Sequence, residues 1–149
     1  MKNLIVSLAA VLVTATSPAL ASESHGDPRA ERTFAKEFAG AQNVKWNRLA
    51  DGYLRVTFLL NGVAAETYFD ADAELLGTVR NIFYNQLPLA VMQTVNNRFV
   101  DAVVIEVKEI TNGEGTKYKV TIEQKNRQYH VRLDSLGQVM DVQKQKRKK

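Results

Sequence analysis

The sequence predicts an α+β fold: two tandem repeats, each a helix followed by four strands, form one antiparallel sheet of about eight strands with both helices on one face. Three observations predict it. Two segments carry apolar residues at helical spacing, and the segments after them alternate between apolar and polar residues. The pattern of the first half also recurs in the second half at a nearly constant offset.

The first repeat is expected to begin with a helix after Asp27-Pro28, an N-cap followed by proline at the first helical position. Its apolar residues follow at helical spacing: Ala30, Phe34, Ala35, Phe38 and Ala39. Gly40 is expected to end the helix. Val44 and Trp46 then share one face of the first strand, and we expect that face to join the core.

Two turns separate the next strands of this repeat. Asp51-Gly52 marks the first turn, and Asn61-Gly62 is the strongest hairpin signal in the chain. Between them, alternation places Leu54, Val56, Phe58 and Leu60 on the core side and Tyr53, Arg55, Thr57 and Leu59 on the other. After the second turn, Ala65, Thr67 and Phe69 return on the core side, with Glu66 and Tyr68 opposite.

The second repeat follows the same plan. Pro88 opens a helix whose apolar residues are Leu89, Val91, Met92, Val95 and Phe99. At an offset of 61 residues, Phe38 corresponds to Phe99, Val44 to Ile105 and Trp46 to Val107. A turn three residues longer raises the offset to 64, so that Leu54 corresponds to Tyr118, Thr67 to Val131, Phe69 to Leu133 and Asn61-Gly62 to Lys125-Asn126. One insertion in an exposed turn reconciles the whole alignment.

An aspartate recurs at the third turn of each repeat. Asp70 corresponds to Asp134, and an aspartate side chain can cap a tight turn. Gly137 supplies the left-handed residue that such a turn favours, whereas the first repeat has Ala73 at that position. We therefore expect the turn of the first repeat to take another form.

The chain divides into a targeting segment, one domain and a charged end. The first residues carry a lysine, an apolar run and an Ala19-Leu20-Ala21 cleavage pattern, which is typical of a secretory signal peptide. The expected parts are a signal peptide at 1–21, a flexible leader at 22–27, a single domain at 28–143 with repeats at 28–82 and 87–143, and a basic tail at 144–149. A periplasmic or secreted location follows from this interpretation.

Charge and cysteine content narrow the function classes. The chain has no cysteine, which excludes disulfides, thiolate metal sites and a cysteine nucleophile. Five of its cations lie at 144–149, while residues 22–143 hold 14 cations against 16 anions, so the body of the chain is not basic. We therefore expect no nucleic-acid partner, and we expect at most a weak contact of the tail with an anionic membrane surface.

The order and spacing of these residues resemble those of periplasmic PepSY-like proteins of the Bacteroidetes type, which have a beta-lactamase-inhibitor-protein-like fold. The matching residues are Val44, Trp46, Tyr53, Val56, Phe58, Asn61-Gly62, Phe69-Asp70, Leu75, Leu87-Pro88, Tyr118, Val120, Leu133-Asp134 and Gly137. Ala73 and the turn QKNRQ depart from the pattern, and no single motif in it is specific. The resemblance implies export, an α+β repeat fold and protein binding or inhibition, without a catalytic residue or a known ligand.

Few residues carry a pattern that would support catalysis or cofactor binding. His130 has no second ligand at metal-binding spacing, and Ser135 lies in a turn without the glycines of a nucleophile elbow. Asp70, Asp72 and Glu74 resemble the start of a calcium loop, but its later glycine and glutamate positions hold other residues. We expect no cofactor, no metal site and no catalytic residue, with calcium binding at this turn left open.

The sheet face opposite the helices is the most informative surface. Its aromatic and arginine residues are of the types enriched in binding hot spots. The candidate protein-binding residues are Tyr53, Arg55, Leu59, Tyr68, Lys119, His130 and Arg132. They favour a non-enzymatic binding module that engages an envelope protein or peptide and inhibits or regulates it.

The alternative is a structural or stress-related envelope protein that associates with anionic surfaces through its basic tail. A small hydrolase is the third hypothesis, and the sequence leaves the partner's identity and the oligomeric state open.

Overall fold

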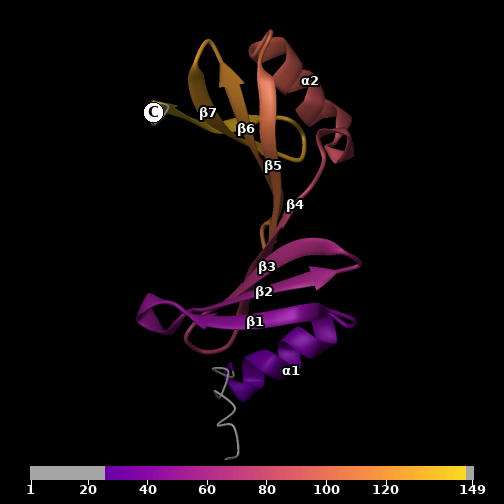
Figure 1. Ribbon diagram of the computed structural model, residues 1–149, viewed down its shortest axis with the longest axis vertical. Helices are drawn as coiled ribbons and strands as arrows, with labels where there is room; N and C mark the ends of the chain where they lie inside the picture. The colour runs from indigo at the N-terminus through magenta and orange to yellow at the C-terminus, as the bar shows by residue number, and fades with distance from the viewer. Residues whose placement is uncertain (1–25, 147–149) are drawn as a thin grey trace, which may run out of the picture.

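The computed structural model describes residues 26–146, which form an eight-stranded antiparallel sheet with two helices (Figure 1). The elements are α1 (Pro28–Glu37), β1 (Gln42–Arg48), β2 (Leu54–Leu60), β3 (Val63–Phe69), β4 (Leu75–Asn81), α2 (Leu89–Arg98), β5 (Val103–Asn112), β6 (Gly115–Gln124), β7 (Arg127–Asp134) and β8 (Val139–Lys146), with 3-10 turns at Ala50–Gly52 and Tyr84–Gln86. The strands lie in the sheet in the order β1 to β8. The predicted fold class is confirmed, and neither helix of the described part is long and apolar enough to cross a membrane.

The helix α1 begins as the sequence predicts but ends at Glu37, before the expected end at Gly40, with Phe38 as its C-cap. The Asp27 carboxylate accepts a hydrogen bond of 2.8 Å from the backbone N–H of Arg29, and Pro28 occupies the first turn. Gly40, just after the helix, has a φ of 85°, which a glycine adopts without steric cost. The helix buries Ala30 and Phe34 against the sheet.

Both helices cover the same face of the sheet. Register pairing connects Phe58, Ala65, Arg80, Glu109, Tyr118 and Leu133 in one row across strands β2 to β7. Because directly paired residues point to the same side of a sheet, this row places the buried residues of both repeats on one face. We call the other side, which no helix covers, the free face.

The covered face holds two separate hydrophobic cores. The first core consists of Ala30, Phe34, Leu54, Val56, Phe58, Ala65, Phe69 and Ala73, with Trp46 and Phe38 packed against it. The second consists of Leu87, Val91, Val95, Val107, Tyr118, Val120, Ile122, Val131 and Leu133. Between them the covered face is polar, since Thr78 and Thr111 are paired there, and so are Arg80 and Glu109. The Arg80 Nε and a Glu109 carboxylate oxygen lie 2.7 Å apart. Only the pairing of β4 with β5 joins the strands of the two repeats.

The two aspartate turns have the same form, so the expectation for Ala73 is wrong. In each turn an Asp70 or Asp134 carboxylate oxygen accepts backbone N–H bonds of 2.9 Å from the residues two and four positions later. Ala73 adopts a φ of 66°, close to the 82° of Gly137. The methyl group of Ala73 is buried in the first core, and this burial offsets the modest strain of the left-handed conformation.

The correspondence of Val44 with Ile105 does not extend to burial. Val44 packs against the first core, whereas the Ile105 side chain is 54% exposed. The register of β5 against β6 shifts between Val104 and Glu106, so Ile105 is an extra residue in that strand. Val104 packs against the second core instead.

The strand β8 continues beyond the expected start of the basic tail. Lys144 pairs with Tyr129 and Lys146 with Arg127, so half of 144–149 belongs to the sheet. Lys144 and Gln145 are nevertheless exposed on this strand, as is usual for a segment rich in like charges. The expected signal peptide, most of the leader and the last three residues lie outside the described residues.

Candidate protein-binding face

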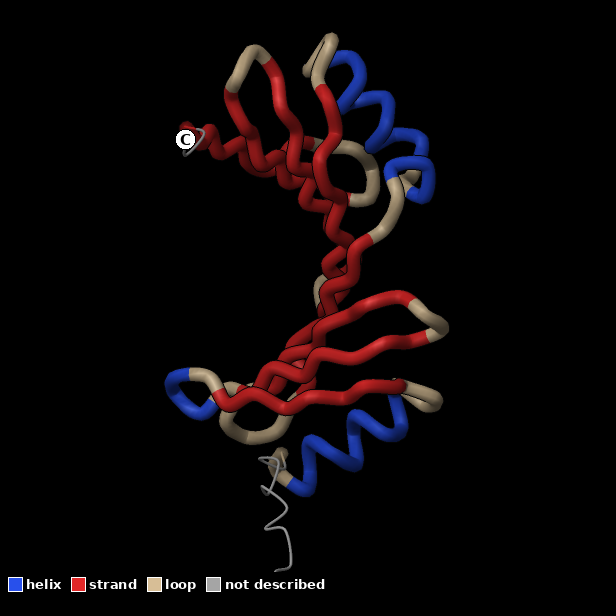
Figure 2. The backbone as a smooth tube through the Cα atoms, in the orientation of Figure 1, coloured by secondary structure: helices blue, strands red, loops and turns tan. Residues whose placement is uncertain are grey.

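The sheet bends into a C, with β4 and β5 at its back and both helices outside the curve (Figures 1 and 2). Since the helices cover the outer side, the free face turns towards the inside of the C. Twist of a large open sheet produces such a curve. The free face is therefore the preformed concave surface of the described chain.

Six of the seven predicted binding residues lie on strands and alternate onto the free face. Arg55 and Leu59 lie on β2, and Tyr68 lies directly opposite Arg55 on β3. The other three are Lys119 on β6 and His130 and Arg132 on β7. Tyr53, the seventh, precedes β2 and is 43% exposed. The structure thus brings the predicted residues together as two groups, one in each repeat, rather than as one continuous patch.

The group in the first repeat centres on Tyr68. Its hydroxyl donates a hydrogen bond of 2.7 Å to a Glu66 carboxylate oxygen. Burial, and then the hydrogen bond to the negative Glu66, raise the pKa of Tyr68 above its ordinary value, while the Arg55 charge opposes this shift. The Arg55 Nε is buried without a hydrogen-bond acceptor among the described residues. A buried donor without an acceptor costs free energy, and a partner's carboxylate that accepts a hydrogen bond from the Arg55 guanidinium would reduce that cost.

The group in the second repeat is a row of cations. Lys108, Lys119 and Arg132 are directly opposite one another on β5, β6 and β7, and Asp141 of β8 ends the row. Lys108 lies 3.5 Å from Glu106, and Arg132 lies 3.2 Å from Asp141. The Lys119 side chain has neither an ion pair nor a hydrogen bond within residues 26–146. This row is positively charged at its centre and neutralised at its ends.

His130 lies diagonally beside this row and is half-buried. Its Nδ1 is 3.0 Å from the hydroxyl of Thr121, its direct partner on β6. This hydrogen bond is a cross-strand contact within the sheet, which fits a structural role for the ring.

A cavity of about 340 Å³ lies between the two groups. Its free-face lining is Lys45, Thr57, Leu59, Ala64, Glu66, Val79, Asn81 and Lys108, contributed by β1 to β5. A volume of this size is at the lower end of the range for ligand pockets, and it accommodates a few side chains of a partner. Of the residues predicted from the sequence, Leu59 alone lines it.

The cavity was missed because the sequence assigned no face to β4 and no register to its pairing with β5. Val79 alternates with Thr78 and Arg80 along β4. This alternation, compared with that of β3, is the sequence signal that could have placed Val79 on the free face. Lys108 was missed because its position depends on which residues of β5 pair with β4. That register is a property of the tertiary fold, so the second side of the cavity had no local signal in the sequence.

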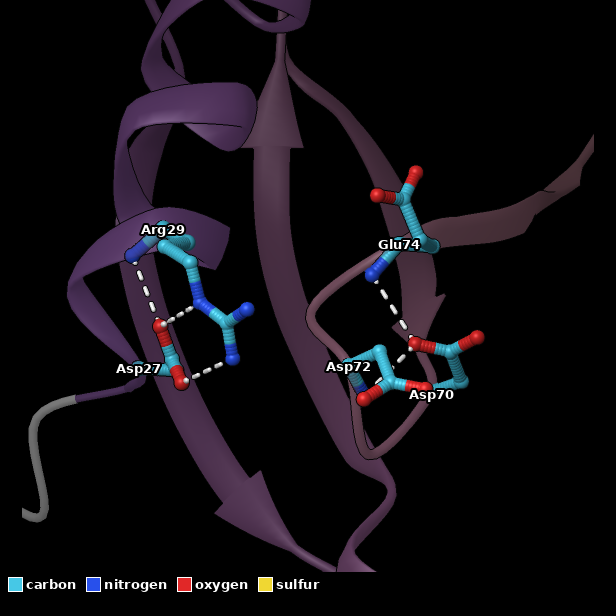
Figure 3. Close-up of polar contacts among 5 residues, drawn as sticks. All are labelled: Asp27, Arg29, Asp70, Asp72 and Glu74. Carbon is cyan, nitrogen blue, oxygen red and sulfur yellow. Dashed lines mark hydrogen bonds and ion pairs between the residues drawn. The ribbon is translucent and has the colours of Figure 1, made fainter.

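The carboxylates of the acidic turn in the first repeat do not point towards one common position where a metal ion could bind (Figure 3). One Asp70 oxygen is used by the backbone of Asp72 and Glu74, and the Glu74 carboxylate points away from it. Asp27 is paired with Arg29, whose hydrogen bonds lower the pKa of that carboxyl. Within residues 26–146, no group of three or more histidine or acidic residues is arranged to hold a metal ion.

Comparison with solved structures places the fold among proteins of Bacteroides. A BLIP-like protein of Bacteroides fragilis has a TM-score of 0.74 and 22% identity, with 84% of this chain and 90% of that chain covered. A periplasmic protein of Bacteroides eggerthii has a TM-score of 0.73 and 19% identity, covering 80% and 89%. A DUF2874 family protein of Bacteroides uniformis has a TM-score of 0.73 and 16% identity, covering 80% and 90%. At these identities the likeness shows the fold, which confirms the BLIP-like architecture expected from the sequence.

Sequence comparison adds nothing to this likeness. No protein-family model matches the chain, and no curated protein matches its sequence. Membership of the PepSY-like family therefore stays a prediction.

Proposed function

We propose that this chain is an exported, non-enzymatic binding protein that captures another protein of the cell envelope on its free face. The observation that carries the proposal is the concave, uncovered sheet surface, with a 340 Å³ cavity between a tyrosine–arginine group and a row of cations. Pockets flanked by tyrosine and arginine are typical of interface hot spots. The inhibitor or regulator role implied by the PepSY-like resemblance belongs to this proposal.

The solved structures support the proposal by analogy of fold. One of them is described as BLIP-like and another as periplasmic, and each of these descriptions concerns the neighbour itself. Because one fold can serve several functions, it is the geometry of the free face, and not the neighbours, that carries the binding function.

The test is capture from the envelope of the native host. The immobilised protein is compared with a Tyr53→Ala/Tyr68→Ala variant shown by circular dichroism to be folded. A Phe83→Ala/Leu136→Ala variant is the matched control, because both of these apolar residues are highly exposed and lie in connecting segments outside the strands, and neither lines the cavity. A protein retained by the wild type and the control but lost from the tyrosine variant supports the proposal. Equal retention by all three, or no specific retention, contradicts it.

The basic end of the chain supports a second candidate, association with an anionic surface. Lys144 lies on β8, where alternation places it on the covered side with Val142, away from the free face. The two functions therefore use different surfaces. Substituting Arg147, Lys148 and Lys149 by Gln leaves β8 complete and tests this candidate. Salt-sensitive binding to phosphatidylglycerol vesicles by the wild type alone supports it.

A further inference from the structure

The free face carries two half-buried cations that lack a carboxylate partner, one in each repeat. Arg55 has a buried Nε without an acceptor, and Tyr68, its neighbour across the strands, gives its own hydroxyl to Glu66. The Lys119 side chain has no ion pair or hydrogen bond in the described chain, whereas Lys108, Lys117 and Arg132 each have an acidic partner. Among the half-buried cations of the free face, Arg55 and Lys119 are therefore the two without an acidic partner in the described residues; Lys45 also lacks one but is exposed.

The position of Lys119 makes its lack of a partner more informative. It lies directly between Lys108 on β5 and Arg132 on β7. Both neighbours are paired with a carboxylate, so Lys119 is the cation of this row whose charge is uncompensated in the described residues. An anionic group above Lys119 would compensate that charge.

The cavity lies between these two cations and combines apolar and charged walls. Leu59, Ala64 and Val79 form its apolar part. Lys45 and Lys108 approach it from opposite sides, on β1 and β5. An occupant that bears an aliphatic or aromatic side chain next to carboxylates matches both kinds of wall.

The curvature of the sheet selects the kind of occupant. The free face is the inner side of a C, so a flat membrane surface meets the rims of the C and does not reach its floor (Figure 1). A loop or hairpin that protrudes from a protein reaches the floor. The cavity volume fits a few side chains of such a loop.

We infer that the free face binds a protruding acidic loop of its partner protein, with carboxylates of that loop placed on Arg55 and Lys119 and an apolar side chain in the cavity between them. This inference rests on the proposed function, and it names the chemistry of the partner that the face selects.

The experiment uses a displayed library of random twelve-residue cyclic peptides as the probe. Selections are run in parallel on the wild type and on an Arg55→Gln/Lys119→Gln variant. An Arg32→Gln/Lys36→Gln variant is the matched control, because it loses the same two charges from exposed positions on α1. Lys119→Gln alone is a second test variant, since Lys119 has no partner in the fold whose loss would disturb folding.

The expected result is enrichment of cyclic peptides that combine Asp or Glu with an aromatic or aliphatic residue on the wild type and the control. Their affinity should fall at least about tenfold on the double variant and should weaken with added salt. Enriched peptides without acidic residues, or acidic peptides that bind the double variant equally well, overturn the inference. Binding to phosphatidylglycerol vesicles that depends on Lys119 also overturns it, because the face would then serve a lipid surface.

The two failures are distinguishable. A captured envelope protein whose retention needs Tyr53 and Tyr68 but is unaffected by Arg55→Gln/Lys119→Gln contradicts the acidic loop and leaves the binding function in place. The absence of any captured protein contradicts the binding function itself.

Discussion

The two cores have the same plan but different fillings. In the first core Phe34 lies 5.0 Å from Phe58 and 5.5 Å from Trp46, measured between ring centroids, so aromatic rings fill the space. The second core is filled mainly by valine, isoleucine and leucine. Alternation, register and turns are common to both repeats, while the identity of the packed side chains varies. Cores tolerate such repacking provided that volume and patterning are kept.

The polar strip between the cores separates them energetically as well as in space. Thr67 is fully buried, and its hydroxyl donates a 2.9 Å hydrogen bond to the carbonyl of Gly77 on β4. Beyond it, Thr78, Thr111 and the Arg80–Glu109 pair continue the strip. Since no apolar contact crosses this strip among the members of the two cores, each repeat should have a stability of its own.

The largest expected effect comes from emptying one core at a time. Phe69 and Leu133 occupy equivalent positions and are fully buried. Either change to Ala should cost about 2–5 kcal/mol. The measurement is urea unfolding followed by circular dichroism and by fluorescence of Trp46, the single tryptophan, which packs against Phe69 in the first core.

Leu133→Ala should lower the circular-dichroism midpoint and leave the fluorescence midpoint near that of the wild type. Phe69→Ala should lower the fluorescence midpoint. Coincidence of the two probes in both variants would mean that the sheet unfolds as one cooperative unit, against the separation of the cores.

The two aspartate turns provide a sharper comparison. A Cβ at Gly137 would lie 2.5 Å from the carbonyl oxygen of Ala90, while its φ of 82° already disfavours a side chain. Gly137→Ala should therefore destabilise the protein by about 2–4 kcal/mol. Ala73→Gly relieves the strain of the left-handed conformation but removes a buried methyl group. Because these two effects oppose each other, the change should alter stability by less than about 1 kcal/mol.

Thermal unfolding of both variants measures the difference. A side chain at Gly137 would meet the Ala90 carbonyl of α2, whereas the Ala73 methyl is accommodated in the first core, and this contrast is the physical reason for the asymmetry. Equal destabilisation by the two changes would show that the backbone conformation alone, and not the approach of Ala90, governs these turns.

A matched exchange at Thr67 and Val131 should have an intermediate effect. These residues are equivalent in the two repeats and both are fully buried. Val131→Thr places a hydroxyl in an apolar core and should cost about 1–3 kcal/mol. Thr67→Val exchanges the hydrogen bonds of its hydroxyl to the Gly77 carbonyl and the Thr78 hydroxyl for apolar burial, and should cost about 1 kcal/mol or less. Urea midpoints measured by circular dichroism test the pair, and a larger loss from Thr67→Val would refute the distinction.

The smallest effect is expected at the junction. The Arg80–Glu109 pair is well formed, but Arg80 is 51% exposed, so water screens the interaction. Arg80→Gln should lower stability by less than about 1 kcal/mol, and high salt should erase the difference from the wild type. A loss that persists at high salt would show that Arg80 supports the junction by packing and not by charge.

Much of the fold could be predicted because local signals repeat in it. Both two-residue hairpin turns use left-handed residues, with φ of 52° and 78° at Asn61-Gly62 and of 50° and 59° at Lys125-Asn126. The alternation from Leu54 to Phe69 gave both faces of β2 and β3 correctly. Such features depend on neighbours in sequence, and the repeat doubled the number of observations.

The remaining features depend on tertiary contacts and had no local signal. The conformation of Ala73 follows from the burial of its methyl group in the first core. Ile105 is the extra residue at a register shift of β5, and which residue of such a shift is exposed depends on packing, since Val44 packs against its core although β1 shifts too. The strand at Lys144 depends on its pairing with β7. For the candidate face, the side chains of β2, β3, β6 and β7 could be assigned, while the cavity depends on how β4 meets β5. The role of all these residues in binding stays a prediction.

The order of the strands has a consequence for how the chain folds. Each strand pairs with the strand that immediately precedes it in the sequence, and every member of the first core lies between Ala30 and Ala73. During synthesis or export from the N-terminus, the chain can therefore form its first core before the residues of the second core are available. No strand of the sheet has to pair with a strand that is distant in the sequence. Local pairing of this kind shortens the search for native contacts and favours rapid folding. While the chain folds in this order, β4 is the edge strand that stays unpaired for longest, because its partner β5 follows only after α2.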